Sequence, residues 1–369
     1  MSTEKVRREP LIHITKRGEL PRKKALLIKS AVILSGVLFC ALVTILMTGL
    51  NPLDVFGSVI EGSFKTPRRF WNMLNSTAIL LGISLAITPA FKMRFWNTGA
   101  EGQVLIGMLA SVACMFYIKD SLPSWLLLII MFVASAIAGA IWAGIPGIFK
   151  AAWNTNETLF TLMMNYVAAQ LVSICIMIWI PNGSQSMPVV NLDSHSGWFP
   201  EILGQQYLFN IIVVACMTIM VYIYLKKSKQ GYEISVVGES ENTARYIGIN
   251  VKKVIIRTVI ISGILCGIMG WVLAAGNAHS IKSDSVGGTG FTAIMVSWMS
   301  KFDPVIMVIS SLLICFLQRG AGQIATDFNI NEAVGSVLTG IIILFVISSE
   351  FFVTYKVHFR QSAKKGGNE

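Results

Sequence analysis

The sequence predicts an all-α polytopic membrane protein with about ten transmembrane helices. Residues of the AVILMFWYC set make up 54% of the 369-residue chain, and Asp, Glu, Lys and Arg together make up only 13%. A soluble domain carries about 25% charged residues, so this chain has too few charges to cover a surface in water. The charges that remain are spaced widely enough to leave ten long stretches without any of them.

Those ten charge-free stretches have lengths that suit membrane helices. Crossing about 30 Å of hydrocarbon takes roughly 20 apolar residues, and six of the ten stretches hold 22 or more. The other four hold 15 to 17 residues, enough to span with flanking residues or to form broken helices. Helices are therefore expected at about 25–50, 70–91, 96–118, 124–149, 158–180, 207–225, 254–276, 291–300, 303–319 and 332–351.

The basic residues predict which side of the membrane each connection faces. If the ten segments alternate, 24 of the 30 Lys and Arg residues fall on one side. Cytoplasmic connections are enriched in Lys and Arg, so this side is the cytoplasm and both termini lie there. The connection 182–206 has no Lys or Arg and is expected outside. Topology and anionic membrane lipid therefore explain the net charge of +11, and no nucleic acid partner is expected.

On this prediction the chain divides into three parts. Residues 1–24 form a basic cytoplasmic leader, expected to be loosely ordered, and residues 352–369 form a polar cytoplasmic tail. Residues 25–351 form the transmembrane domain, in which 226–253 is a long cytoplasmic connection. A cleaved signal peptide is not expected, because the first apolar stretch of 24 residues is longer than the apolar region of a signal peptide.

Small residues predict which helix faces pack closely. Pairs of small residues four positions apart let two helix backbones approach each other in a membrane. Pro146 is expected to bend or end its helix. The small-residue pairs expected to pack closely are Ser135 with Gly139, Ala140 with Gly144, and Gly263 with Gly267.

A faint internal similarity raises a further interpretation of the architecture. Both 97–110 and 287–300 place polar residues and glycines at the start of a short apolar segment, five segments apart. Five segments per half would invert one half relative to the other, as in transporters that bind solute at paired broken helices. The sequence leaves this 5+5 inverted repeat open.

The sequence lacks the residue patterns typical of metal, haem and nucleotide-binding sites. All six cysteines lie within the expected helices and the four histidines lie outside them, so no metal or haem ligand set is expected between helices. The phosphate-binding pattern G-x-x-x-x-G-K-[ST] does not occur. We therefore expect no catalytic centre, no metal and no cofactor on this chain.

Polar residues gather at three places at the edges of the apolar stretches. An unpaired polar group is costly in hydrocarbon, so such residues usually face a protein interior or a water-filled path. The stretch FWNTGAEGQVLIG at 95–107 holds Asn97, Glu101 and Gln103 among glycines that permit unusual backbone geometry. Two interpretations fit: a helix break beside a solute path, or an ordinary helix start where Glu101 complements the helix dipole. The other two groups lie at 154–165 and 277–298.

The middles of the expected helices carry no Asp, Glu or Lys. Proton relays and ion-coupled pumps ordinarily need such groups inside the membrane. A path lined by Asn, Thr, Ser and Trp instead suits a neutral polar solute such as a sugar or a nucleoside.

Four stretches resemble the permease subunits of ATP-binding-cassette (ABC) importers for nucleosides, within a broader group that also imports ribose-type sugars and branched-chain amino acids. The most specific are NTGAEGQVLIGMLA (97–110) and GYEISVVGESENTARYIGINVKKVIIRTVIISGILCGIMG (231–270). NETLFTLMMNYVA (156–168) and GGTGFTAIMVSWMSKFDP (287–304) agree with them. The resemblance spans roughly residues 70–350, and Thr98 departs from it, standing where many members carry an aliphatic residue.

The resemblance implies a pore-forming subunit of the bacterial cytoplasmic membrane. Its implied partners are a cytoplasmic ABC ATPase, a second permease subunit that completes a heterodimer, and an extracytoplasmic substrate-binding protein or lipoprotein. Taken with the polar groups described above, it places the expected substrate path near six residues, which are Asn97, Glu101, Gln103, Asn165, Phe291 and Trp298.

The long cytoplasmic connection carries the expected contact with the ATPase. Ser240 is a suitable N-cap, Glu241 favours the first turn and Gly248 favours an end, so a short helix is predicted between them. An ordinary basic loop is the simpler interpretation, whereas the helix and the resemblance favour coupling. The residues expected to contact the ATPase are Glu239, Asn242, Arg245 and Tyr246.

The predicted function is therefore nucleoside import, with a simple sugar such as ribose or galactose as the alternative. An ion-coupled secondary transporter would need coupling-ion ligands within the helices, and their scarcity counts against it. A membrane-embedded enzyme would need converging acids, histidines or metal ligands, and none cluster in the sequence.

Overall fold

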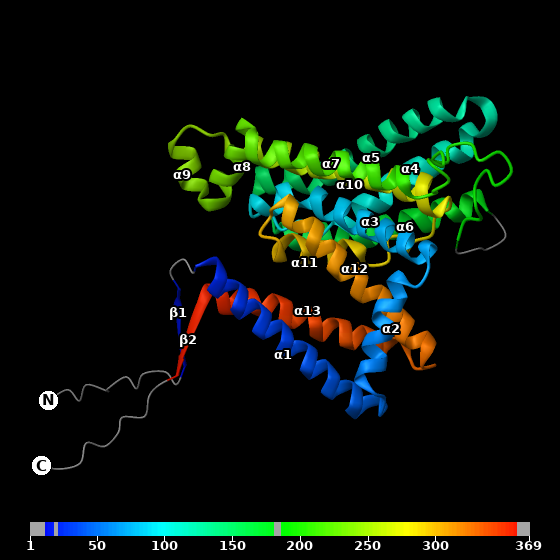
Figure 1. The fold of residues 1–369 in the computed structure, drawn as a ribbon. Helices are drawn as coiled ribbons and strands as arrows, with labels where there is room; N and C mark the ends of the chain where they lie inside the picture. The colour runs from blue at the N-terminus through cyan, green and yellow to red at the C-terminus, as the bar shows by residue number, and fades with distance from the viewer. Residues whose placement is uncertain (1–11, 18–20, 181–185, 360–369) are drawn as a thin grey trace, which may run out of the picture. The chain divides into compact units, whose positions relative to one another are not determined.

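The computed structural model describes residues 12–17, 21–180 and 186–359, most of which are helical (Figure 1). They form two compact units. The membrane unit comprises residues 66–315. The terminal unit combines the two ends of the chain, up to residue 65 and from residue 316 onward.

The terminal unit pairs the first long helix with the last. α1 packs along α13, and β1 pairs antiparallel with β2 so that Ile12 lies opposite Phe359. Cys40, Val55 and Leu338 belong to its buried core. Its elements are β1 (Ile12–Lys16), α1 (Arg22–Thr48), α2 (Pro52–Phe64), the end of α12 (Pro304–Asp327), α13 (Glu332–Thr354) and β2 (Tyr355–Phe359).

Both ends of the chain contain more regular structure than the sequence suggests. The expectation of a loosely ordered leader is wrong for the strand at 12–16 and the helical residues 22–24, and β2 lies in the polar tail. Residues 1–11, 18–20 and 360–369 lie outside the described residues. The alternation of apolar and polar residues in IHITK suits a strand. Its partner lies near the opposite terminus, and no local pattern identifies that partner.

The membrane unit is a bundle of long helices with one short apolar helix and a pair of short polar ones. A 3-10 turn (Lys119–Ser121) follows α4 and a π-helical turn (Ala274–Ala278) follows α10. The helices are α3 (Pro67–Lys92), α4 (Ala100–Ile118), α5 (Ser124–Trp153), α6 (Glu157–Trp179), α7 (Leu208–Lys227), α8 (Lys229–Glu239), α9 (Glu241–Tyr246), α10 (Val251–Leu273), α11 (Thr289–Met299) and the start of α12.

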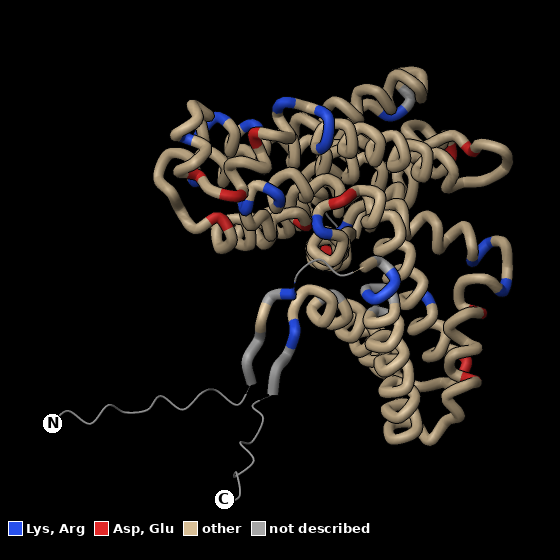
Figure 2. The backbone as a smooth tube through the Cα atoms, turned by 60° about the vertical axis from the view of Figure 1, so that its left-hand side comes forward, with Lys and Arg blue, Asp and Glu red and all other residues tan. Residues whose placement is uncertain are grey.

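The expected all-α polytopic class is confirmed. Nine helices among the described residues are long and apolar enough to cross a membrane, and α11 is a shorter apolar helix of 11 residues near the predicted short segment. The β1–β2 pair is the exception in the described part of the chain. α3 and α10 are central in the membrane unit, since their apolar windows are 83% and 78% buried against 28% for α5, α6 and α7. Charged residues of this unit lie toward helix ends and connections (Figure 2).

Two of the three predicted small-residue pairs join α5 to α10. A methyl group on Gly267 would overlap the carbonyl oxygen of Ser135, and one on Gly139 would overlap the carbonyl oxygen of Gly263. α4 approaches the same face, because a methyl group on Gly107 would lie 2.6 Å from the Cα atom of Gly267. These glycines let three helix backbones pack directly against one another.

The third pair does not make such a contact. A methyl group on Gly144 would have its nearest neighbour, a side-chain carbon of Ile260, at 3.6 Å, which is ordinary van der Waals distance. Among the described residues, the predicted close backbone approach is therefore absent at Gly144.

Two helices extend further than the sequence predicts. α5 continues through Pro146 to Trp153, so the expected end near residue 149 is wrong. Pro146 and Gly147 are both buried, and a methyl group on Gly147 would touch Val259 of α10 at 3.1 Å, so tertiary packing holds the helix past the proline. α12 likewise continues to Asp327, beyond the expected end near residue 319.

The compact units do not coincide with the two halves of an inverted repeat. The membrane unit takes helices from both halves of the chain, and α10 packs against α3, α4 and α5. The 5+5 inverted repeat therefore stays a prediction.

Candidate functional site

Two buried amide side chains bind each other at the start of α4. Asn97 Nδ2 donates to Gln103 Oε1 (3.2 Å), and Gln103 Nε2 donates to Asn97 Oδ1 (3.0 Å). Asn97 Oδ1 also accepts the backbone N–H of Gly99 (3.1 Å), the residue that precedes the helix. The polar atoms of this pair thus find their partners within the chain, as buried amides require.

Asn165 holds α6 against the same turn. Its Oδ1 accepts the N–H of Gly102 (2.8 Å), and its Nδ2 donates to the carbonyl oxygen of Thr98 (2.9 Å). The Thr98 hydroxyl donates to the carbonyl oxygen of Thr158 on α6 (2.9 Å), a bond that an aliphatic residue at this position could not make. A methyl group on Gly102 would lie 2.9 Å from Asn165 Oδ1, so the glycine permits this contact.

The carboxylate of Glu101 caps a second helix, α11. Its Oε1 accepts the N–H of Gly288 (2.7 Å), and its Oε2 accepts the N–H of Gly290 (2.8 Å). The first N–H groups of a helix lack partners within it and carry partial positive charge, so a carboxylate there is stabilising. Gly290 brings the backbones together, because a methyl group on it would lie 2.6 Å from Glu101 Oε2. Glu101 therefore joins α4 to α11, besides lying in the first turn of its own helix.

The other two residues predicted for the path form part of an exposed aromatic surface. Phe291 is 48% exposed and Trp298 is 44% exposed. Trp298 stacks on Trp96, with ring centroids 5.2 Å apart and an interplanar angle of 23°, and Phe91 lies edge-on to it. The six predicted residues thus divide into four hydrogen-bonded side chains around the start of α4 and two exposed aromatic side chains on α11.

The long polar connection forms the short helix that the sequence predicts. Ser240 Oγ accepts the N–H of Thr243 (3.2 Å) as the N-cap of α9, and Gly248 adopts a φ of +85° just beyond the end of the helix. Tyr246 is 93% exposed. Glu239, Asn242 and Arg245 are also exposed, so all four residues predicted to contact an ATPase lie at the surface of the chain.

Ion pairs and close backbone contacts connect this region to the long helices. Arg257 of α10 pairs with Glu233 of α8 (2.9 Å), and Lys226 at the end of α7 pairs with Asp303 before α12 (2.5 Å). A methyl group on Gly238 of α8 would overlap the last carbonyl oxygen of α3. A displacement of α8 and α9 would therefore act directly on α3, α7 and α10.

A chain of three asparagines lies near the C-terminal end of α10. Asn210 Nδ2 donates to Asn75 Oδ1 (2.9 Å) and to the carbonyl oxygen of Gly276 (3.0 Å), and Asn75 Nδ2 donates to Asn277 Oδ1 (2.9 Å). This network holds the π-helical turn, whose irregular geometry leaves backbone groups in need of partners. The sequence signal that marks Asn75 and Asn210 is their polarity within charge-free stretches.

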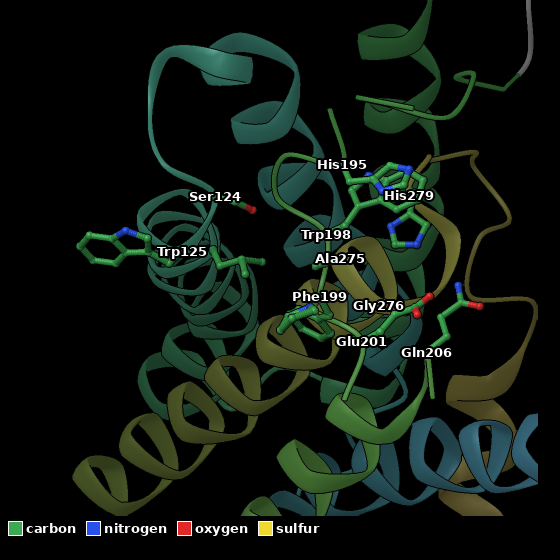
Figure 3. Close-up of a pocket in the computed structure, with 12 residues that line it drawn as sticks. Ser124, Trp125, His195, Trp198, Phe199, Glu201, Gln206, Ala275, Gly276 and His279 are labelled. Carbon is green, nitrogen blue, oxygen red and sulfur yellow. The ribbon is translucent and has the colours of Figure 1, made fainter. Parts of the chain in front are cut away.

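The π-helical turn is part of the lining of a cavity of about 440 Å³ (Figure 3). The elements that line it, the start of α5 and the connection between α6 and α7, lie at the opposite end of the membrane unit from α9 (Figure 1). The start of α5 and the connection after residue 186 supply its other walls. Its polar side chains include Ser124, His195, Glu201, Gln206 and His279, and its aromatic ones are Trp125, Trp198 and Phe199.

Two histidines and a tryptophan stack within this cavity. The Trp198 ring centroid lies 4.4 Å from that of His195 and 3.7 Å from that of His279. His279 is 8% exposed, and its Nδ1 atom has no hydrogen-bond partner among the described residues. Burial, aided by nearby His195, lowers the pKa of His279 to about 4, so its imidazole is neutral near pH 7. The sequence places both histidines outside the expected helices but gives no sign that they meet.

These features define the class of the protein. Apolar helices of membrane-spanning length, a polar junction beside a short helix, and an exposed capped helix at one end are the parts of a membrane transport subunit. The chain belongs to the family described as "Branched-chain amino acid transport system / permease component", whose model matches residues 69–347.

Individual relatives cover most of the chain. The glucose ABC transporter permease protein of Haloferax volcanii is 27% identical over 343 residues, 90% of this chain and 88% of that protein. The guanosine ABC transporter permease protein of Bacillus subtilis is 26% identical over 355 residues, 94% and 99% of the two chains. A nucleoside ABC transporter permease protein of Lactococcus lactis is 24% identical over 335 residues, which cover 88% of this chain and 91% of that protein. A second guanosine ABC transporter permease protein of B. subtilis is 27% identical over 235 residues, which cover 60% of this chain and 72% of that protein. The chain is thus a multi-pass ABC transporter permease.

Proposed function

We propose that this permease carries nucleosides inward across the cytoplasmic membrane. The observation that supports this substrate is the guanosine permease of B. subtilis, because the match takes in 94% of this chain and 99% of that protein. The nucleoside permease of L. lactis supports the same class. A simple sugar is the second candidate, favoured by the glucose permease of H. volcanii at 27% identity over 343 residues.

The proposed substrate path runs beside α4, α6 and α11. In this proposal Asn97, Gln103 and Asn165 fix the start of α4, and Glu101 fixes the start of α11. The exposed rings of Phe291 and Trp298 then face the solute. Aromatic side chains suit a nucleobase, because any of the bases can stack on an aromatic ring.

The proposed energy source is an ABC ATPase on a separate cytoplasmic chain that contacts α8 and α9. Tyr246 and Arg245 would contact the ATPase, and the α8 contacts would transmit its movement to α3, α7 and α10. ATP binding shifts the permease between inward- and outward-facing states only if the ATPase prefers one of them. Two guanosine permease proteins of B. subtilis match this chain, which supports a heterodimer with a second permease subunit. A substrate-binding protein or lipoprotein would complete the importer outside, with both termini of this chain in the cytoplasm.

The coupling assignment predicts the effect of changing the α9 surface. Glu239→Lys combined with Tyr246→Ala is expected to reduce the amount of ATPase that co-purifies with the permease at least tenfold, since both side chains are exposed and hold no part of the fold. Tyr166→Ala is the matched control, because Tyr166 is an exposed tyrosine on α6. ATPase recovery equal to that of the control would refute coupling through α9.

The substrate assignment is tested by reconstitution. The assembled complex in proteoliposomes, with ATP inside the compartment that the ATPase faces, is expected to import labelled adenosine or guanosine and to leave glucose, ribose and galactose outside. Uptake that requires a sugar binding protein and ignores nucleosides would establish the sugar alternative. Uptake that persists without ATP and collapses with the ion gradient would instead indicate a secondary transporter.

A further inference from the structure

We propose that the cavity around His279 is a separate solute site on the external face of this permease, and that it binds a neutral nucleoside. The identity of the solute and the external orientation rest on the proposed function. The site itself rests on four features: an unpaired buried imidazole, a helix that ends in a π turn, a mixed aromatic and polar lining, and no Lys or Arg among the described residues of that lining.

The imidazole of His279 is buried with one ring nitrogen unpaired. A neutral imidazole has one donor and one acceptor nitrogen, and buried polar atoms are rarely left without a partner because their desolvation is costly. His279 Nδ1 has none among the described residues. Figure 3 shows the ring between the stacked rings of His195 and Trp198 and the side chains of Glu201 and Gln206. Nδ1 itself is closed to solvent, so a hydroxyl or ring nitrogen of a bound solute would bind the other ring nitrogen, Nε2, of this cavity-lining side chain.

The floor of the cavity is an irregular helix that specific partners hold in place. The π turn at Ala274–Ala278 belongs to a rare class that occurs often at functional sites. The N–H of Phe199 donates to the carbonyl oxygen of Ala275 (2.9 Å), and Asn210 bonds that of Gly276. A methyl group on Gly276 would overlap the side chain of Asn210, so only glycine fits at this position while that hydrogen bond is kept. These contacts build the concave floor from α10, α7 and the connection between α6 and α7.

The lining suits a ring-shaped solute with polar edges. A volume of about 440 Å³ lies within the range of small-molecule pockets. The lining is mainly apolar, while Glu201 and Gln206 are exposed at the rim. Carboxylate and amide side chains bind base edges through paired hydrogen bonds. A bound nucleoside would use all of these groups: its base edge would bind Glu201 and Gln206, and a ribose hydroxyl would bind His279.

The charge of the lining excludes phosphorylated solutes. No Lys or Arg is among the described residues that line the cavity, and Glu201 is the acidic one. The end of α10 adds the partial negative charge of a helix C-terminus. A phosphate group would therefore be repelled, and a nucleoside is expected to bind better than the corresponding nucleotide.

Equilibrium dialysis of labelled adenosine tests the site on the purified full-length chain in nanodiscs, without any binding protein. Saturable binding is expected, and unlabelled guanosine should compete with it. AMP, ribose and glucose are expected to compete at least tenfold more weakly. Absence of saturable binding, or equal competition by AMP, would overturn the proposal.

Substitutions locate the binding within the cavity. Glu201→Ala with Gln206→Ala is expected to weaken adenosine binding at least tenfold, and both side chains are exposed, so the fold should be retained. His279→Leu should weaken binding comparably, whereas Asp193→Ala, an exposed acid on the same connection outside the cavity, should leave it unchanged. Unaltered binding in the Glu201 and Gln206 double variant would place adenosine elsewhere and refute the site.

The two proposals fail in different experiments. Nucleoside uptake by the reconstituted complex together with no binding to the isolated chain would refute the cavity site and leave the proposed function standing. Uptake of sugars alone would refute the proposed function, and dialysis with adenosine would still decide the cavity.

Discussion

Gly267→Ala is expected to destabilise the permease, although alanine favours a helix over glycine by about 1 kcal/mol. The added methyl group would overlap the carbonyl oxygen of Ser135, and nothing flexible can move aside because the obstacle is backbone. Overpacking of this kind costs about 1–3 kcal/mol or more, which corresponds to a fall of roughly 3–10 °C in the unfolding temperature of a domain of this size. Gly267→Leu should prevent close packing of α5 on α10 altogether.

Thermal unfolding in detergent, followed by tryptophan fluorescence and by loss of the monodisperse peak in size-exclusion chromatography, measures this effect. Gly144→Ala is the matched control on α5, because its methyl group would meet a side-chain carbon of Ile260 at 3.6 Å. It should unfold at or above the wild-type temperature. A Gly267→Ala variant as stable as Gly144→Ala would show that α5 and α10 do not meet through their backbones.

Glu101→Leu is expected to reduce transport strongly while the complex still assembles. The substitution leaves the N–H groups of Gly288 and Gly290 without their partners. Each hydrogen bond to a charged group contributes about 1.5–3 kcal/mol, so α11 loses the main attachment of its N-terminus to α4. Uptake should fall at least tenfold. Glu101→Gln keeps one acceptor oxygen and should give an intermediate rate.

Hydrogen exchange separates this attachment from a direct contact between Glu101 and the solute. The amides of residues 288–290 should exchange faster in Glu101→Leu than in the wild type, even with no solute present. Asp193→Asn, which changes an exposed carboxylate, should alter neither exchange nor uptake. Normal protection at 288–290 together with lost uptake would assign Glu101 to solute binding, and wild-type uptake would leave it with no functional role.

The long helices could be predicted from the sequence because their cause is local. A charge-free stretch of sufficient length must satisfy its backbone hydrogen bonds internally once it enters lipid, and a helix does so within the stretch itself. The α9 cap follows for the same reason, since Ser240 and Thr243 are three residues apart. The ends of helices are harder to predict from the sequence. In α5, packing of the segment around Pro146 and Gly147 against α10 lets the helix continue past the expected break.

The partners of the polar residues could not be predicted. The sequence groups Asn97, Glu101 and Gln103 in one short motif. In the structure, Asn97 and Gln103 hydrogen-bond to each other, whereas Glu101 binds the start of α11. Glu101 and Gly288 lie 187 positions apart. No periodicity or cap rule connects residues at that separation, so the motif by itself supports both a path and a helix start.

The sequence by itself determined that this protein is a helical membrane permease with a short capped helix in its longest polar connection. Hydrophobic length, charge spacing and cap residues act over one or a few helical turns and need no partner. The tertiary structure alone decided which helices touch through glycine, which carboxylate caps which helix, and that His195, Trp198 and His279 surround one cavity. Those outcomes depend on where distant backbones meet, because a hydrogen bond or close contact exists only at a few ångströms, whatever the distance along the chain.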